Sequence, residues 1–308
     1  MKLDFSKPLY ILAPLAGYTD LPFRSVVKKF GADLTISEMI SSNALVYESQ
    51  KTLKMLQKSP LEDPYFVQIA GSDPEIVKKA VEKLNEMEGI DGIDLNCGCP
   101  VPKVVRQGAG SALLKDPDKL ARIVETIKKH SRKPYTSAKI RLGFEKNDVV
   151  RIAKAIESAG ADFITIHGRT RSGGFKAPVD YEAIAEARAA VKIPVIANGD
   201  ITDYQKAKWV LDTITPYGVM IGRGAVGRPW IFHQLKSGSE EVDRELKKHI
   251  VLEHFRQMVE FYGDRGVVLF RKHLHTYSKG LPGAGEFRKK VNEIEDPSEM
   301  ERAIEEFF

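Results

Sequence analysis

Polar side chains that could do chemistry recur along this sequence at the ends of short apolar runs. Each run is followed by a stretch whose apolar residues recur every three or four positions, a pattern typical of a strand followed by a helix. Parallel strands in a barrel bring their carboxyl ends to one face, where active sites are built, so these side chains are expected to converge. In chain order they are Pro14, Leu15, Ala16, Glu38, Gln68, Asn96, Cys97, Cys99, Lys139, Arg141, His167, Arg169, Arg171, Asn198, Gly199, Asp200, Gly222 and Arg223.

The residue types in this set favour a ligand with a polar ring and a phosphate. Lys139 and His167 are donors on neighbouring runs, and the amide of Gln68 can both donate and accept. The loop 222–227 satisfies G-x-G-x-x-G, but no further strand ending in an acid follows it, so we interpret it as the phosphate loop after the last barrel strand. Flavin mononucleotide (FMN) fits, because a lysine beside its ring would stabilise the negative charge of the reduced form. We expect no metal, since no Asp, Glu, His or Cys cluster has ligand spacing.

The two cysteines, Cys97 and Cys99, lie too close in sequence for an unstrained disulfide, and we expect a reducing, cytoplasmic setting. Cys99 stands between Gly98 and Pro100 just beyond a run, where a loop can hold a thiol beside a ligand. A thiol with an ordinary pKa of about 8.5 is mostly protonated at neutral pH and can serve as a general acid. Cys97 is still inside its run and is expected to pack as a small hydrophobic side chain.

The runs themselves predict a (β/α)8 TIM barrel followed by a smaller all-helical domain. Eight strand–helix units over about 230 residues match such a barrel, whereas a doubly wound open sheet would need fewer strands and a glycine-rich loop after the first. After Pro229 only helical sequence follows, so the predicted domains are a catalytic barrel over residues 1–230 and a helical domain over 231–308. The expected strands are 10–16, 34–39, 65–71, 92–97, 135–143, 163–168, 194–199 and 218–224, and the clearest helices are 74–87, 118–129, 148–159 and 203–211.

Charge is distributed unevenly along the 308 residues, whose net charge is +5. Residues 231–308 hold 13 Lys and Arg against 15 Asp and Glu, so the excess of positive charge lies in the rest of the chain. Within this acidic segment the window 266–290 is locally basic, which fits either a solvated helix face or a surface that binds phosphates. We predict no signal peptide and no membrane-spanning segment.

Several motifs resemble those of the tRNA-dihydrouridine synthase family, in order and spacing over essentially the whole chain. The segment 94–114 resembles the LNxGCPxxxVxxxGxGAxLL element of that family, and the segment 13–20 resembles its opening APMAGVTD. The remaining matches are Gln68 with Gly71-Ser-Asp-Pro74, Lys139-Ile-Arg-Leu-Gly143, His167-Gly-Arg-Thr-Arg171, Asn198-Gly-Asp-Ile201, Gly222-Arg-Gly-Ala225, Arg271-Lys-His273 and Gly280-Leu-Pro-Gly-Ala284.

The resemblance implies an FMN enzyme that reduces the C5–C6 double bond of particular uridines in tRNA, with NADPH or NADH as reductant. Cys99 would donate the proton to C5 while reduced flavin gives hydride to C6. Asn96 and Arg141 would meet the uracil edge, and Arg169, Arg171, Arg271 and Lys272 would contact RNA phosphates. The FMN-binding residues would be Pro14, Leu15, Ala16, Gln68, Lys139, His167, Asn198, Gly199, Asp200, Gly222 and Arg223.

Two departures from the family pattern accompany the resemblance. Leu15 replaces a methionine, and Gly173 and Gly174 stand where the family often has a glutamine. The alternatives are a small-molecule FMN reductase of the dihydroorotate dehydrogenase kind, a barrel that uses Lys139 as a Schiff base, and an inactive flavin- or RNA-binding module. The target uridine and the preferred nicotinamide stay open, and a monomer is expected.

Overall fold

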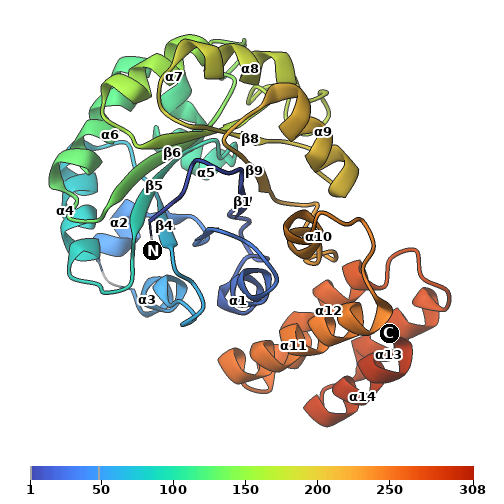
Figure 1. Ribbon diagram of the computed structural model, residues 1–308. Helices are drawn as coiled ribbons and strands as arrows, with labels where there is room; N and C mark the ends of the chain where they lie inside the picture. Colours follow the sequence, from blue (N-terminus) through green and yellow to red (C-terminus); the bar gives the residue numbers. More distant parts are fainter. Residues whose placement is uncertain (1, 48) are drawn as a thin grey trace.

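The computed structural model describes residues 2–47 and 49–308. It shows parallel strands surrounded by helices, with a separate group of helices at the carboxyl end (Figure 1). The strands are β1 (Leu9–Leu12), β2 (Thr35–Ile36), β3 (Ile40–Ser41), β4 (Tyr65–Ala70), β5 (Gly92–Cys97), β6 (Tyr135–Arg141), β7 (Phe163–His167), β8 (Val195–Asn198) and β9 (Gly218–Ile221).

The strands form a nearly closed barrel, which confirms the predicted (β/α)8 fold. All pairings are parallel, in the order β1-β9-β8-β7-β6-β5-β4-β2, with β3 also beside β4. The Leu12 N–H donates to the Leu34 carbonyl at 3.1 Å, and this bond joins β1 to the segment that enters β2. The two ends of the sheet, β1 and β2, are therefore brought together. The carboxyl ends of all strands meet at one face.

The second position of the barrel is split into β2 and β3, where one strand over 34–39 was expected. The Ser37 hydroxyl accepts the Gln68 N–H at 3.0 Å, in place of a backbone carbonyl. A side chain that occupies the ladder position interrupts the regular pairing, and the strand resumes only at Ile40. The break leaves Met39 at the mouth of the barrel.

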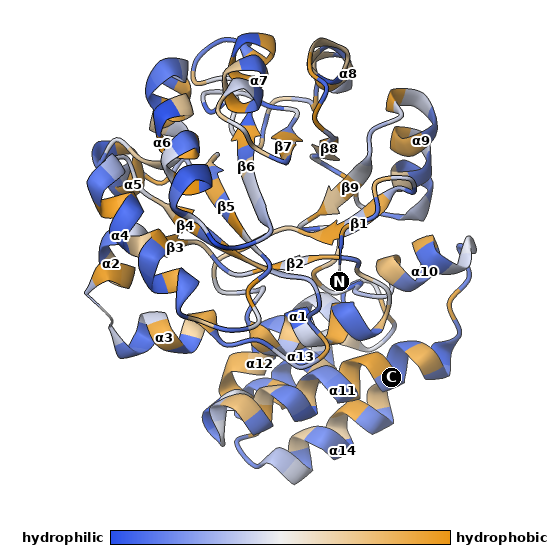
Figure 2. Cartoon of the chain, turned by 60° about the vertical axis from the view of Figure 1, so that its left-hand side comes forward, coloured by the Kyte–Doolittle hydropathy of each residue, from blue (hydrophilic) through white to orange (hydrophobic). Residues whose placement is uncertain are grey.

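Three of the barrel helices begin at an aspartate that caps the first turn. Asp73, Asp116 and Asp203 each accept a backbone N–H from the first turn of α4, α6 and α9, at 2.9, 2.9 and 2.8 Å. The helices around the barrel are α1 (Leu21–Lys29), α2 (Ser42–Val46), α3 (Gln50–Leu56), α4 (Pro74–Asn85), α5 (Pro102–Arg106), the 3-10 turn η1 (Gly110–Lys115), α6 (Pro117–His130), α7 (Val149–Ser158), α8 (Tyr181–Ala190), α9 (Tyr204–Ile214) and α10 (Ile231–Ser237). Their apolar faces turn toward the strands (Figure 2).

The interior of the barrel is apolar at its amino end and polar at its carboxyl end. Phe66 and Phe163 lie 5.8 Å apart between ring centroids and fill the amino end. A Cβ at Gly92 would lie 2.5 Å from the Phe66 ring, so this position has room only for glycine. Because side chains alternate along a strand, the inward residues two and four positions later form the floor of the mouth. Gln68 follows Phe66 and His167 follows Phe163 in this way.

Four further helices, α11 (Arg244–Tyr262), α12 (Arg265–Tyr277), α13 (Ala284–Glu293) and α14 (Pro297–Phe307), pack around a second hydrophobic cluster. They contact the barrel closely, since a Cβ at Gly227 would lie 2.8 Å from the backbone of Thr276. Helix α10 instead packs with the barrel, through Ile231 and Phe232. The domain division at residue 230 stays a prediction, and this packing places α10 on the barrel side.

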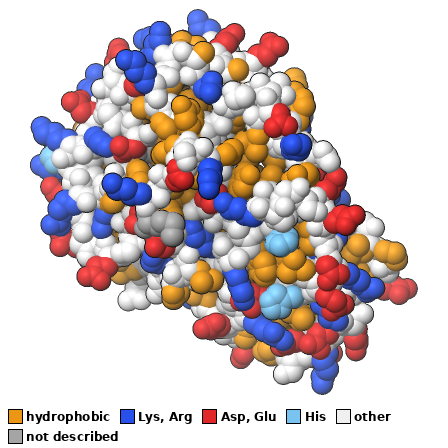
Figure 3. Space-filling view, in the orientation of Figure 1, with side chains coloured by type: hydrophobic (Ala, Val, Ile, Leu, Met, Phe, Trp, Pro, Cys, Tyr) orange, Lys and Arg blue, Asp and Glu red, His pale blue; other side chains and the backbone are white. Residues whose placement is uncertain are grey.

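Acidic and basic side chains are interspersed over the face drawn in Figure 3, and hydrophobic side chains gather near its middle. In the part of the chain that the structure describes, no helix is long and apolar enough to cross a membrane.

Candidate functional site

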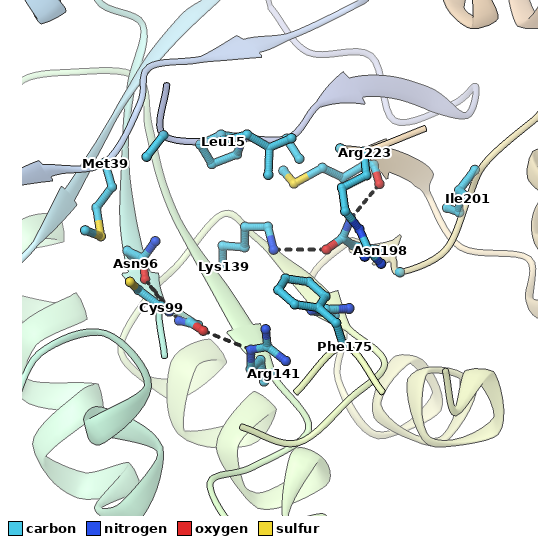
Figure 4. Close-up of a pocket in the computed structure, with 18 of the residues that line it drawn as sticks. Leu15, Met39, Asn96, Cys99, Lys139, Arg141, Phe175, Asn198, Ile201 and Arg223 are labelled. Carbon is cyan, nitrogen blue, oxygen red and sulfur yellow. Dashed lines mark hydrogen bonds between the residues drawn. The ribbon is translucent and has the colours of Figure 1, made fainter. Parts of the chain in front are cut away.

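A cavity of about 550 Å³ opens at the carboxyl ends of the barrel strands, a size typical of small-molecule sites. It is lined by all eleven residues that the sequence proposed for the cofactor, and also by Asn96, Cys99 and Arg141 (Figure 4). The predicted convergence of strand ends is therefore observed, whereas the roles of these residues stay predictions. The other lining residues are Ala13, Met39, Gly98, Pro100, Phe175, Ile201, Thr202, Met220 and Gly224.

A buried carboxylate lies beneath the cavity. The two oxygens of Asp94 accept hydrogen bonds from the Gln68 Nε2 and the Ser137 hydroxyl, each at 2.7 Å. Burial raises the pKa of Asp94 to about 6, against the lowering effect of these hydrogen bonds. Sequence reasoning missed Asp94 and Ser137. Their inward positions, two before Asn96 and Lys139 on the same strands, were the signal that could have found them.

Asn96 connects Gln68 to the loop that carries Cys99. Because the Gln68 Nε2 donates to Asp94, the Oε1 of Gln68 faces Asn96 and accepts from the Asn96 Nδ2 at 2.7 Å. The Asn96 Oδ1 accepts the backbone N–H groups of Gly98 at 3.1 Å and Cys99 at 2.9 Å. The Cys99 carbonyl accepts the Ser111 N–H at 3.0 Å. The backbone of Cys99 is thus held on both sides, while its side chain borders the cavity.

The two cysteines have different surroundings, as predicted. Cys99 is partly exposed at the cavity, whereas Cys97 is fully buried in the cluster between strands and helices. Burial raises the pKa of Cys97, and its thiol lies 3.8 Å from the Leu95 carbonyl. Only Cys99 is placed to meet a molecule in the cavity.

Lys139 and Asn198 form a second polar pair across the mouth. The Lys139 Nζ donates to the Asn198 Oδ1 at 3.0 Å, and the Asn198 Nδ2 donates to the Met220 carbonyl at 2.7 Å. Burial, and then the nearby charge of Arg141, lower the pKa of Lys139 to about 8. A lysine with this pKa is mostly charged at neutral pH and gives the cavity a fixed positive group.

His167 is neutral. Burial and neighbouring cations, first Lys139, lower its pKa to about 2. The Arg169 Nη1 faces the His167 Nε2 at 3.4 Å, and since a guanidinium only donates, Nε2 accepts and the ring proton is on Nδ1. Arg169 is itself buried and ion-paired with Asp200. It is therefore engaged inside the barrel mouth instead of reaching outward.

The loop after β9 combines a cation with free backbone donors. The Arg223 Nη2 donates to the Asp200 Oδ1 at 2.8 Å, and the hydrogen bond from Arg169 together with both guanidinium charges lowers the pKa of Asp200. Within the described residues, the backbone N–H groups of Arg223 and Gly224 donate to no other protein group. Converging N–H groups beside an arginine are what a phosphate requires.

Phe175 is an aromatic residue of the site that the sequence did not single out. Its ring is exposed. The guanidinium of Arg223 lies 4.4 Å from the ring centroid, and that of Arg141 lies 5.5 Å from it. Arg141 also donates from Nε to the Gly98 carbonyl at 2.9 Å and from Nη1 to the Thr170 carbonyl at 3.2 Å. The loop 171–178 has no strand or helix periodicity, so no sequence signal marked Phe175.

The remaining residues predicted to contact RNA lie outside the cavity. The Arg171 guanidinium packs over the Phe144 ring at 4.9 Å. The Arg271 Nη2 donates to the Ile294 carbonyl at 2.8 Å, within the helical region. The Lys272 Nζ donates to the Gly17 carbonyl, in the loop that follows β1. Arg271 and Lys272 thus have protein partners that the sequence could not show.

A groove of about 790 Å³ continues from the cavity to the helical region and shares Leu15, Ala16, Thr202, Arg223 and Gly224 with it. No Asp or Glu lines it within the described residues. Its cationic and aromatic residues, apart from Arg223, are Tyr18, Arg228, Trp230, Lys247, Tyr277, Lys279 and Phe308. A basic groove with aromatic rings is typical of surfaces that bind single-stranded nucleic acid.

Among the described residues, no three His, Cys, Asp or Glu side chains gather as metal ligands would.

Comparison with known proteins identifies the chain's relatives. The sequence model of the family described as "Dihydrouridine synthase (Dus)" matches residues 11–308. A "Probable tRNA-dihydrouridine synthase" of Helicobacter pylori is 53% identical over 308 residues, covering 99% of this chain and 94% of the relative. "tRNA-dihydrouridine synthase B" of Pasteurella multocida is 41% identical over 306 residues, covering 96% and 92%.

Solved structures of lower identity share the barrel fold. Histamine dehydrogenase from Rhizobium sp. 4-9 aligns with a TM-score of 0.57 and 11% identity, over 80% of this chain and 48% of that one. A variant of NCR from Zymomonas mobilis aligns with a TM-score of 0.50 and 16% identity, over 76% and 88%. These likenesses support the fold alone.

Proposed function

The chain belongs to the tRNA-dihydrouridine synthase family, whose members reduce uridine in tRNA, and we propose that it does so with FMN bound in the barrel cavity and Cys99 as proton donor. The observation that carries the proposal is the placement of Cys99, Lys139 and the 222–224 loop around one cavity. A thiol, an ammonium and a phosphate loop are the groups that this reaction needs.

The donors of the cavity fit FMN. The free N–H groups of Arg223 and Gly224, with the Arg223 side chain, would hold the phosphate. Lys139 would stand beside the isoalloxazine ring, where its charge favours the reduced, anionic form. Bound FMN would supply the hydride that goes to C6 of the uracil. The residues assigned to FMN are Pro14, Leu15, Ala16, Gln68, Lys139, His167, Asn198, Gly199, Asp200, Gly222 and Arg223.

Cys99 would deliver the proton to C5 of the same uracil. Hydride arriving at C6 leaves negative charge on C5 and the adjacent carbonyl, and a proton held opposite the flavin completes the reduction. The Asn96 Oδ1 and the Ser111 N–H fix the backbone of Cys99, so that its thiol has few alternative positions. Cys97 would take no part, because it is buried away from the cavity.

Arg141 and Asn96 would bind the uracil edge, each through an N–H group that donates to no protein group among the described residues. Arg141 uses Nε and Nη1 on carbonyls, and Nη2 remains for a uracil oxygen. Asn96 uses one hydrogen of Nδ2 on Gln68, and a second remains. The exposed ring of Phe175 stands over the same part of the cavity and would cover the base.

A stacked uridine must leave the tRNA helix to reach the cavity floor. We assign the RNA chain on either side of it to the groove that adjoins the cavity, where Arg228, Lys247 and Lys279 would contact phosphates. The predicted contacts of Arg169, Arg171, Arg271 and Lys272 remain part of the sequence-based proposal. Of these, Arg171 is the best placed, because among the described residues its guanidinium makes neither an ion pair nor a hydrogen bond, whereas Arg271 and Lys272 donate to carbonyls.

NADPH or NADH would re-reduce the flavin. Every group that the proposal uses belongs to one chain, so we propose a monomer without a metal ion. A tRNA substrate favours a cytoplasmic location. The small-molecule alternative is disfavoured by the groove between the barrel and the helical region, which no Asp or Glu of the described residues lines. Mass-spectrometric mapping of dihydrouridine in tRNA from a strain lacking this gene tests the proposal. We expect loss of dihydrouridine at defined positions, and an unchanged tRNA modification profile would overturn it.

A further inference from the structure

The loop between β1 and α1, residues 13–20, is held from the helical region. The Gly17 carbonyl accepts from the Lys272 Nζ of α12, and the Gly17 N–H donates to the Glu38 carboxylate. At the end of the loop, the Asp20 Oδ2 accepts from the Tyr262 hydroxyl of α11 at 3.0 Å. Two of these three contacts come from residues more than 240 positions away in the sequence.

This β1–α1 loop is one side of the cavity. Pro14, Leu15 and Ala16 all line it. Leu15 also packs toward the proposed phosphate loop, since a Cβ built on Gly222 would lie 3.6 Å from its Cδ1. A shift at Gly17 would therefore reach the cavity wall through the adjoining residue Ala16.

Leu15 and Thr19 of this loop are fixed by barrel residues, whereas Gly17 and Asp20 have contacts from the helical region. The Leu15 N–H donates to the Thr19 hydroxyl at 2.8 Å, and buried Arg24 donates to the Thr19 carbonyl at 3.1 Å. Ala16 and Gly17 are exposed. The Tyr18 and Thr19 N–H groups donate to the Leu15 carbonyl, each at 3.0 Å, so the turn is closed locally. Within this turn, the contacts of Glu38 and Lys272 orient the exposed Gly17 peptide.

The side chain of Lys272 is directed at this tip. Its Nζ lies 5.2 Å from the centroid of the Tyr18 ring, in addition to its contact with the Gly17 carbonyl. The adjacent His273 packs edge-on against the same ring, at 5.6 Å. Lys272 therefore faces the barrel loop, whereas its sequence context suggested a phosphate contact.

We propose that Lys272 is a positioning residue, which sets the cavity wall at Pro14–Ala16 by holding the Gly17 carbonyl from the helical region. Its effect on FMN rests on the function proposed above, but its effect on the loop does not. Without Lys272, the loop tip should open more often, and the cavity should bind FMN less tightly. Removal of one partly exposed, charge-assisted hydrogen bond should raise the exchange rate of the loop and the Kd for FMN, each by about threefold to tenfold.

The test compares Lys272→Met, Lys272→Arg and Lys289→Met in the full chain. Lys289 is exposed on α13, and its replacement removes the same charge from the helical region, which makes it the matched control. Hydrogen–deuterium exchange of peptides covering 13–20, in protein stripped of flavin, reads the loop directly. Fluorescence quenching on titration with FMN reads the cavity.

We expect faster exchange of the 13–20 segment and a higher Kd for FMN in Lys272→Met, partial rescue in Lys272→Arg, and wild-type values in Lys289→Met. Wild-type exchange and FMN affinity in a folded Lys272→Met protein, with only tRNA affinity lowered, would show instead that Lys272 contacts RNA. If Lys272→Met does not fold, Tyr262→Phe tests the second contact, and unchanged exchange in that variant would overturn control from the helical region. A wild-type enzyme inactive on tRNA would refute the proposed function and leave the exchange result valid.

Discussion

The Asn96 Oδ1 accepts the backbone N–H of Cys99 at 2.9 Å, and the Asn96 Nδ2 donates to the Gln68 Oε1 at 2.7 Å. One amide therefore joins the barrel floor to the loop that carries Cys99. Since Asp94 fixes the orientation of Gln68, a buried carboxylate decides which way both amides face.

Asp94→Asn should disturb this chain of amides. One of the two acceptor oxygens becomes an NH2 group. Either the Gln68 amide then turns over, or the Ser137 hydroxyl accepts from the new NH2 and its own proton loses its buried partner. Leaving a buried donor unpaired costs about 1–3 kcal/mol, so FMN affinity should fall by about tenfold or more. Titration of the stripped variant with FMN measures this. An Asp94→Asn protein that binds FMN as tightly as wild type would show that the network does not support the cofactor site.

Lys139 should give the reductive half-reaction a pH dependence. Its pKa of about 8 means that the ammonium is present below pH 8 and is lost as the pH rises through that value. Because the charge favours anionic reduced flavin, reduction by NADPH should slow above pH 8, and Lys139→Ala should be slower and bind FMN about tenfold less tightly. Stopped-flow absorbance without tRNA measures both. A pH profile shared by wild type and Lys139→Ala would remove Lys139 from this role.

Lys247→Glu with Lys279→Glu should weaken tRNA binding through the groove next to the cavity. Removing one ion pair between a lysine and a phosphate should reduce the slope of log K against log salt concentration by about 0.7 to 0.9. FMN binding should be unchanged, because neither residue lines the barrel cavity. Filter binding of each single variant and of the double variant at several salt concentrations measures the slope, with Lys289→Glu as the control that matches the charge change of each single variant. An unchanged slope in the double variant would move the RNA away from this groove.

The buried pair His254 and His273 should make the protein less stable in acid. Burial lowers the pKa of both, to about 3 for His273, and their rings lie 4.6 Å apart. In the unfolded chain a histidine has a pKa of about 6.5, so below that pH the unfolded state binds more protons. The free energy of unfolding is thus fully present above pH 6.5 and is lost as the pH falls, by about 1.4 kcal/mol per pH unit for each histidine.

Urea unfolding between pH 7.5 and 4.5 measures this loss. His273→Phe should halve the contribution of the pair, since phenylalanine fits between Phe23 and Phe270, whose rings stack on His273 at 5.8 and 5.7 Å. The same acid dependence in His273→Phe and wild type would assign it to other groups.

Much of the site could be predicted because it follows from strand ends. Gln68 and Lys139 lie in the second half of their strands, His167 and Asn198 end theirs, and parallel strands carry their carboxyl ends to one face. Asp94 was missed because it lies one inward position below the mouth. Phe175 was missed because an irregular loop has no periodicity from which to place a side chain.

The basic residues show what sequence could not supply. Arg271 and Lys272 stand in a basic window, but they donate to the carbonyls of Ile294 and Gly17, and Arg169 pairs with Asp200. Each partner comes from a segment far along the chain, and two are backbone carbonyls that composition cannot reveal. The role of the window stays a prediction, while the partners of its side chains came only from the fold.

The central claim is that Cys99, and not Cys97, gives the proton to the uracil. The direct measurement is the amount of dihydrouridine formed per flavin reoxidised by tRNA in wild type, Cys99→Ala and Cys97→Ala. Cys99→Ala should bind FMN and accept electrons from NADPH normally, yet form dihydrouridine about 10²–10⁴-fold more slowly, as expected on loss of a general acid. Cys97→Ala should stay within a few-fold of wild type, because its thiol is buried outside the cavity. A Cys99→Ala enzyme with near wild-type turnover, or an inactive but folded Cys97→Ala enzyme, would contradict the account.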